Sequence, residues 1–512
     1  MAPHMSAVAD RPPNSETTSQ DEDYDDDKAV VARCEDPKEM GDKNKLANEI
    51  NWQIDDIPLK YRIMAFCFVV LFSTGAAFAE ATLGPLKSTI MKELNLNNAQ
   101  FASISTASNL VNTVLPIIGG AVMDYYGGLY GAAIASGFCV VGSIIAASST
   151  NSGKYGLLIG GRIFMGFGSI IIETSQNKLY AHWFNGSLLA FAIALDLAWN
   201  SVTTVIARAC AVPMSRLGGW YGWGLWIPAI STVFCALIVV GYGVFERRVV
   251  PQQYRPVAGR DIVKGGGLKR TQAAFLNILR IARTVYSANL TDIQERTRGT
   301  TALTGGYYSS LLNVVVIVVV PVLGLFYDKI GWRMPFVSLG AIAYVIAFAL
   351  IGLTTVNAIA PILIASFALA LNVLPFIGSI PLIINDPTLM GTAYGMWSSF
   401  VACNNIILEV ACGAIQDATP GQSYERVIYF LIAIKAWQVF EGPILDFLDG
   451  KLLGHVLRKN EKQRIKLRDE MALEGKEFKG WKVYKSVTMF FGGQYVIMVI
   501  VSWVLFFIYT IG

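Results

Sequence analysis

Long apolar runs recur along most of the chain, and short polar stretches separate each run from the next. Six runs come first, at 61–84, 99–123, 129–149, 155–181, 187–211 and 223–245. Five more follow at 303–327, 334–354, 358–384, 390–415 and 425–448, and a last run covers 486–511. A helix of about 20 apolar residues crosses the hydrocarbon core of a bilayer. The pattern therefore predicts an all-α, polytopic membrane protein.

Two stretches between the apolar runs are strongly basic. Residues 246–300 hold 11 Lys and Arg against four acids, and residues 451–485 hold 11 against five. Basic loops remain on the cytoplasmic side, yet only five clear runs separate these two stretches, and an odd number would place them on opposite sides. We therefore expect a further crossing within 270–292, although Arg280 and Arg283 near its middle are costly in lipid. The alternatives are an amphipathic cytoplasmic helix or a sequence that lacks part of this helix.

With that weak seventh helix, the chain divides into two six-helix halves around a central cavity. The expected parts are a disordered cytoplasmic tail at 1–60, a first bundle at 61–245, a basic central loop at 246–300, a second bundle at 301–450, a basic cytoplasmic segment at 451–485 and an extra membrane helix at 486–512. The tail is polar, with the acidic patch "DEDYDDD" at 21–27, and it lacks the apolar core of a signal peptide. The first membrane helix is therefore expected to act as the insertion signal, and the whole chain to cross thirteen times.

The same charged motif follows the second helix of each half. "GAVMDYYG" at 120–127 and "GLFYDKIG" at 324–331 share a Gly, an Asp four positions later and a Gly three positions after that. Repetition at one position in both halves indicates an internal duplication, as in secondary transporters. Glycine permits close helix approach and tight turns. The motif residues are Gly120, Asp124, Gly127, Gly324, Asp328 and Gly331, and we expect them to gate the two halves.

Each motif Asp is expected to sit at the positive end of a helix from the other half. Asp124 would face the start of "GTAYG" at 391–395, and Asp328 would face the start of the helix that follows "WFNG" at 183–186. Two such contacts would join the halves on one side of the membrane.

These residues resemble the major facilitator superfamily, whose loop signature follows the second and eighth helices. The second copy extends the match to Arg333, whereas the first copy has Tyr125 and Tyr126 where the family carries basic residues. The family's fourth-helix signature, an Arg followed by glycines, is matched by "GRIFMGFG" at 161–168, which contains Arg162. The resemblance covers roughly residues 60–450 and implies alternating access between two halves.

Within this superfamily, "SQNKLYAHWFNG" at 175–186 and the segment 391–417 look like the lysosomal dipeptide transporter branch and its fungal-type relatives. That likeness implies a carrier of small peptides or similar solutes in a lysosomal or vacuolar membrane, with the plasma membrane as the alternative. In that branch an acid on the fourth helix and an Arg on the fifth hold the two ends of a zwitterion. Here Glu173 lies one turn from the family's acid, and Ser201 stands at the Arg position.

Polar residues inside the apolar runs are the candidates for binding substrate or protons, because such residues are costly in lipid and usually line a cavity or pair with each other. Several occur four apart, on one helical face. The candidates are Glu173, Asn177, Asp196, Asn200, Asn405, Glu409 and Arg162. The alternative for some of them is a structural hydrogen bond between helices.

Other functions find little support in the sequence. The net charge of +4 is too small and dispersed for nucleic acid, and the seven cysteines and three histidines form no metal-binding or catalytic grouping. No G-x-x-x-x-G-K-[ST] motif occurs, so ATP is not expected to drive the protein. We expect no enzyme and no cofactor. The expected partners are a small-molecule substrate and lipid, by uniport or proton coupling, with an accessory subunit left open. The alternative is a non-transporting receptor or sensor on the same fold.

Overall fold

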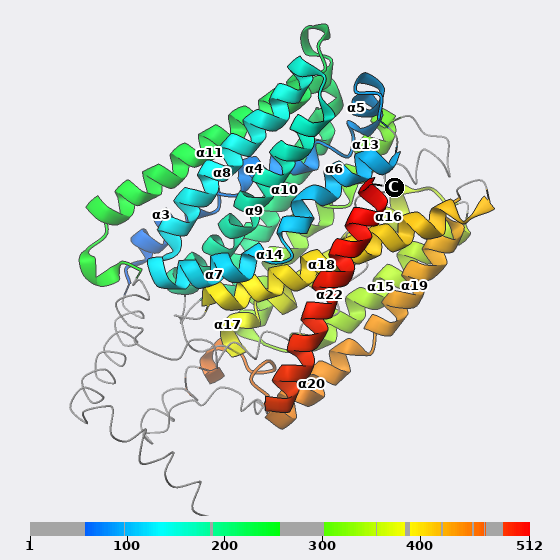
Figure 1. Cartoon of the computed structure of the whole chain (residues 1–512). Coiled ribbons are helices and arrows are strands. Elements are labelled where there is room, and N and C mark those ends of the chain that lie inside the picture. Colours follow the sequence, from blue (N-terminus) through cyan, green and yellow to red (C-terminus); the bar gives the residue numbers. More distant parts are fainter. Residues whose placement is uncertain are drawn as a thin grey trace, which may run out of the picture. The chain divides into compact units, whose positions relative to one another are not determined.

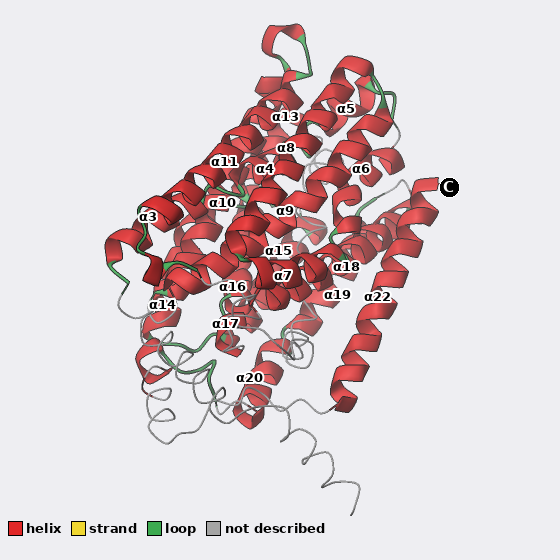
Figure 2. Cartoon of the chain, turned by 60° about the vertical axis from the view of Figure 1, so that its left-hand side comes forward, coloured by secondary structure: helices red, strands yellow, loops and turns green. Residues whose placement is uncertain are grey.

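The computed structural model describes residues 57–96, 98–184, 188–256, 302–354, 356–383, 390–420, 423–452, 455–464, 466 and 485–511. The described residues form helices and loops without a strand, as Figure 2 shows. The chain separates into two units, Met1–Asp56 and Ile57–Gly512, and the described helices belong to the second unit. The all-α prediction is confirmed.

The first half of the unit is a run of helices from residue 59 to residue 248. They are α3 (Leu59–Val69), α4 (Thr74–Ala81), the short α5 (Lys87–Glu93), α6 (Asn98–Val111), α7 (Leu115–Tyr126), α8 (Gly128–Ser152), α9 (Tyr155–Phe184), α10 (Leu189–Ser215) and α11 (Trp223–Arg248). The short helix α5 was not predicted, because seven residues carry no clear apolar period.

The second half begins after the central stretch. Its helices are α13 (Ala302–Leu311), α14 (Val314–Lys329), α15 (Met334–Leu353), α16 (Ile359–Ile377), α17 (Ile380–Ile383), α18 (Met390–Asp417), α19 (Glu425–Gln438) and α20 (Glu441–Leu452), and α22 (Lys485–Ile511) follows separately. The predicted crossing at 270–292 lies outside the described residues.

Ten helices in the described part of the chain are long and apolar enough to cross a membrane. The two remaining apolar runs are also helical. One is divided into α6 and α7, and the other is α22, whose apolar part is Gly492–Ile508. Each of the twelve apolar runs predicted from the sequence is thus a helix or a broken helix.

The break between α6 and α7 lies next to Pro116, the second residue of α7. Proline has no N–H to donate, so the helical ladder cannot continue unchanged past it. Ile117 donates to Val114 O at 3.3 Å, which is a tighter turn than the α-helical bond to Thr113 O. The carbonyl of Thr113 is therefore free to accept a bond from elsewhere.

The two halves meet along two seams, and the most extensive contact in each seam is between one helix of the first half and one of the second. In the first seam α7 packs against α18, and in the second α10 packs against α14. The colours of Figure 1 show how distant these partners are in sequence, with cyan α7 beside yellow α18. Because α7 and α14 carry the repeated motif, the seams are equivalent under the duplication.

Candidate functional site

Asp124 joins the halves at the first seam. Its Oδ1 accepts a hydrogen bond from the backbone N–H of Gly391 at 2.9 Å. Its Oδ2 accepts from the N–H of Thr392 at 2.8 Å and from the Thr392 hydroxyl at 2.6 Å. The carboxylate therefore caps the first turn of α18, where unpaired N–H groups and the helix dipole favour a negative charge. We call this contact the first latch.

Asp328 makes the equivalent contact at the second seam. Its Oδ2 accepts from the backbone N–H of Phe191 at 3.1 Å, in the first turn of α10. We call this contact the second latch, and the end of the bundle that holds both latches the latch end. Both contacts lie where the sequence predicts them, so the expected geometry is confirmed.

The motif glycines permit these contacts. A Cβ on Gly120 would lie 2.3 Å from Gly391 O, and one on Gly324 would lie 2.6 Å from the Cβ of Ala194. The third positions, Gly127 and Gly331, have φ of 96° and 89°, in the left-handed region that favours glycine. The first glycine of each motif thus allows the two helices of its seam to approach closely. The last glycine allows the turn that follows α7 or α14.

The two motif aspartates have different cationic neighbours. Lys178 of α9 lies 2.7 Å from Asp124 Oδ1 and also donates to Met123 O at 3.0 Å. It supplies the positive charge that Tyr125 and Tyr126 do not. At the second latch, Arg333 is 1% exposed, and its Nε and Nη1 have no hydrogen-bond partner. Burial, followed by the charge of Arg464, lowers the pKa of Arg333 to about 9.

Part of the second basic stretch also contacts the latch end. Glu461 accepts a hydrogen bond from the N–H of Leu188 at 3.2 Å, just before α10 begins. The N–H of Trp332 donates to Arg458 O at 3.3 Å. Burial raises the pKa of Glu461 and lowers that of Arg464. The segment that follows α20 therefore touches both halves.

A first group of polar side chains lies where α9 packs against α10. Asp196 accepts from the Tyr180 hydroxyl at 2.8 Å and from Gln176 Nε2 at 3.5 Å. Glu173 is exposed and interacts electrostatically with Asp196. The structure thus brings together two of the candidate carboxylates. Tyr180 and Gln176 are partners that the sequence alone did not indicate.

A second charged group lies about three turns away along α9, roughly 16 Å toward the opposite end. Arg162 is 4% exposed, donates to Ser108 Oγ at 3.4 Å and has an unpaired Nε. Glu80, at the end of α4, interacts electrostatically with both Arg162 and Glu409. Because Glu409 belongs to α18, this group contains charges from both halves.

The three remaining candidates, all asparagines, differ in how far their side chains are exposed. Asn200 is exposed on α10, Asn405 is half-buried on α18, and Asn177 is 8% exposed on α9. The four-residue spacing of Glu173 and Asn177 therefore leads to different environments, since one side chain is exposed and the other is buried.

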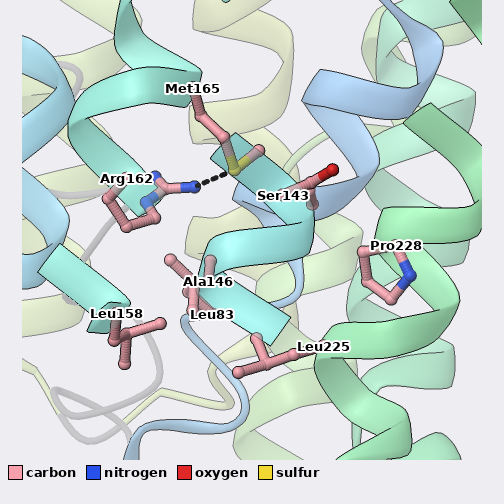
Figure 3. Close-up of a pocket in the computed structure, with 9 residues that line it drawn as sticks. Leu83, Ser143, Ala146, Leu158, Arg162, Met165, Leu225 and Pro228 are labelled. Carbon is pink, nitrogen blue, oxygen red and sulfur yellow. Dashed lines mark hydrogen bonds between the residues drawn. The ribbon is translucent and has the colours of Figure 1, made fainter. Parts of the chain in front are cut away.

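A small cavity lies beside Arg162 among α4, α8, α9 and α11. Figure 3 shows Arg162 and Met165 above the apolar side chains that line it, including Leu158 and Leu225. Its volume is about 20 Å³, which is room for about one water molecule. This cavity is too small for an organic solute.

The chain matches the profile of the Major Facilitator Superfamily over residues 68–405. Among curated proteins, it is similar to the lysosomal dipeptide transporter MFSD1 of Danio rerio, with 23% identity over 80% of this chain and 92% of that protein. The MFSD1 protein of Homo sapiens is 20% identical over 81% of this chain and 92% of its own length.

Solved structures show the same fold at low identity. The transporter FucP in the outward conformation matches with a TM-score of 0.57 and 15% identity, over 75% of this chain and 99% of that one. The human organic anion transporter MFSD10 (TETRAN) matches with a TM-score of 0.56 and 14% identity, over 75% of this chain and 100% of that one.

Proposed function

This chain belongs to the major facilitator superfamily and has the fold of its transporters, and we propose that it carries a small dipeptide-like or amino-acid-like solute by alternating access. The observation that carries this proposal is the pair of latches. Each motif carboxylate caps a helix of the other half, at the same end of both seams. Caps of this kind are worth about 0.5–2 kcal/mol each, so thermal motion can open them.

The latch end faces the cytoplasm in this proposal. The basic stretches 246–300 and 451–485 support this orientation, because Lys- and Arg-rich loops remain cytoplasmic. Residues of the second stretch contact the latch end through Glu461 and Arg458. Single cysteines at positions 265, 330 and 465 should react only from the cytoplasmic side, and labelling of 330 or 465 from outside sealed vesicles contradicts the orientation.

The group around Arg162 and Glu409 and the group around Glu173 and Asp196 together are the proposed site for a zwitterion and a proton. Arg162 would bind the carboxylate of the substrate. Glu409, which belongs to the facing half, would bind the amine of the substrate. This assignment replaces the fifth-helix Arg of the dipeptide transporter branch, whose position holds Ser201 here. Glu173 and Asp196 form the second part of the proposed site, where two neighbouring carboxylates favour sharing of a proton. Uniport remains the alternative to proton coupling.

Uptake by the purified protein in liposomes tests the function directly. Radiolabelled dipeptides and amino acids should enter faster than sugars or dicarboxylates, and an imposed pH gradient distinguishes proton coupling from uniport. Thermal-shift binding with the same panel provides a second readout. Binding of a zwitterion without uptake or exchange would favour the receptor or sensor, and neither binding nor uptake would contradict the proposed substrate class.

The proposed compartment is the lysosomal or vacuolar membrane. Its support is the name of the MFSD1 relatives, which are 20–23% identical. Co-localisation of a tagged full-length chain with vacuolar and plasma-membrane markers tests this proposal.

A further inference from the structure

The last helix, α22, lies across one of the two seams. It contacts α6 of the first half and α18 of the second. Figure 1 shows it in red beside yellow α18, and Figure 2 shows the same neighbours from another side. Its outer face is exposed and apolar, with Ile497, Ile500 and Ile508 each more than half exposed, as expected for a surface that faces lipid. Its inner face contacts both halves.

Two aromatic side chains of α22 bind the same residue of the first half. The Tyr495 hydroxyl donates to Thr113 O at 2.5 Å, and Trp503 Nε1 donates to Thr113 Oγ1 at 2.8 Å. Tyr495 and Trp503 lie about two turns apart on one face of the helix. Thr113 itself is fully buried.

Thr113 accepts these bonds because it lies in the break between α6 and α7. Its carbonyl has lost the α-helical partner that Ile117 would supply, since Ile117 donates to Val114 O instead. An unpaired carbonyl within the membrane is costly, and Tyr495 satisfies it. The contact therefore forms at the bend of the helix that carries Asp124.

The same helix also packs on the second half. The rings of Tyr495 and Phe400 of α18 have centroids 4.9 Å apart. On the same side of α22, Ser502 and Phe506 are buried. One tyrosine thus touches Thr113 and Phe400 together, so these two residues cannot separate unless Tyr495 loses its contact with one of them.

We propose that α22 is a clasp that holds α6 against α18 beside the first seam and stabilises the arrangement in which both latches are closed. The proposal rests on the alternating-access function above. The clasp is a regulatory element at the first seam, and its release would precede or accompany opening of the first latch.

Spin labels at opposite sides of the latch end provide the test. Tyr126→Cys and Ile330→Cys, both exposed and on different halves, report the separation of the halves as a distance distribution in the full chain. Native cysteines are replaced in this background. Tyr495→Phe removes the hydroxyl that donates to Thr113 O and keeps the ring, and Trp503→Phe removes the indole N–H that donates to Thr113 Oγ1. Val504→Ala, on the exposed face of α22, is the matched control.

Each phenylalanine variant should raise the ratio of open to closed latch ends about threefold, a factor typical of one hydrogen bond between membrane helices. The double variant should raise it about tenfold, and Val504→Ala should leave it unchanged. Asp124→Asn serves as the positive control for latch opening. If it shifts the distribution while the double variant does not, α22 is a passive lipid-facing helix. If no variant, Asp124→Asn included, changes the distribution, alternating access fails and the clasp fails with it.

Discussion

Lys178 Nζ lies 2.7 Å from Oδ1 of Asp124, the same oxygen that accepts a hydrogen bond from Gly391 of the other half. An ion pair within the first half thus shares its carboxylate with a contact between the halves. Both side chains are largely buried, with 13% and 10% of their surfaces exposed. Lys178 therefore offsets the cost of holding the latch carboxylate away from water.

Lys178→Met should destabilise the folded protein by about 1–3 kcal/mol, because it leaves a buried carboxylate without its cation. Thermal unfolding in detergent measures the change. Lys154→Met, at an exposed position near the opposite end, is the control and should unfold like the wild type. Equal unfolding temperatures for both variants would show that Lys178 contributes nothing to the latch.

Asp124→Asn and Asp328→Asn should both favour the open latch end, and Asp124→Asn should do so more strongly. Asp124 accepts three hydrogen bonds from the other half, whereas Asp328 accepts two, from the backbone N–H groups of Phe191 and Ala190. A charge at a helix N-terminus is worth about 0.3–2 kcal/mol, so several-fold shifts are expected without loss of folding. The Tyr126 and Ile330 spin-label pair measures both. A larger effect of Asp328→Asn would contradict the ranking.

Gly120→Ala should weaken the first seam, because its Cβ would lie 2.3 Å from the carbonyl oxygen of Gly391. Backbone must then shift on one side of the seam, and we expect lower uptake together with a lower unfolding temperature. Gly137→Ala is the matched control, since no atom lies within 4 Å of its Cβ position. Normal uptake and a normal unfolding temperature for Gly120→Ala would contradict the proposed role of this close contact.

Acidification should favour the latched arrangement through Glu461. Burial raises the pKa of this carboxyl group, the charge of Asp328 raises it further, and Arg464 and Arg333 lower it. The latched state therefore binds a proton more tightly than a state with Glu461 in water, and linkage favours the latched state as pH falls through the raised pKa. The closed fraction of the spin-label pair, followed from about pH 7 to about pH 4.5, should rise in the wild type. Glu461→Gln should reduce this rise, and an unchanged profile in the variant would exclude Glu461 as its source.

Glu173→Gln should reduce uptake strongly and leave folding near normal, because the side chain is exposed in the structure. Asp196→Asn should reduce both, since it also disturbs the bonds from Tyr180 and Gln176. Uptake and thermal unfolding together separate these outcomes. Glu93→Gln, at an exposed position on α5, is the control. Wild-type uptake by Glu173→Gln would remove Glu173 from the proposed site.

The membrane helices and the positions of the latch aspartates could be predicted because each has a recognisable sequence pattern. Apolar length marks a membrane helix, and the repeated motif places Asp124 and Asp328 at equivalent positions. Lys178, Tyr180 and the Tyr495–Thr113 bond could not be predicted. No repeated motif marks these three contacts, whose partners lie 54, 16 and 382 positions away. The charges at Glu80 and Glu409 likewise meet only through the contact between halves.

The receiving side of each latch is a backbone N–H, and every amino acid except proline has one. Position 191 could therefore change during evolution without loss of the second latch, as long as its helix begins at the same place. Position 391 has less freedom, because a Cβ there would lie 2.6 Å from Asp124 Oδ1. A duplicated protein built in this way can let its two halves diverge widely while each aspartate keeps a binding partner.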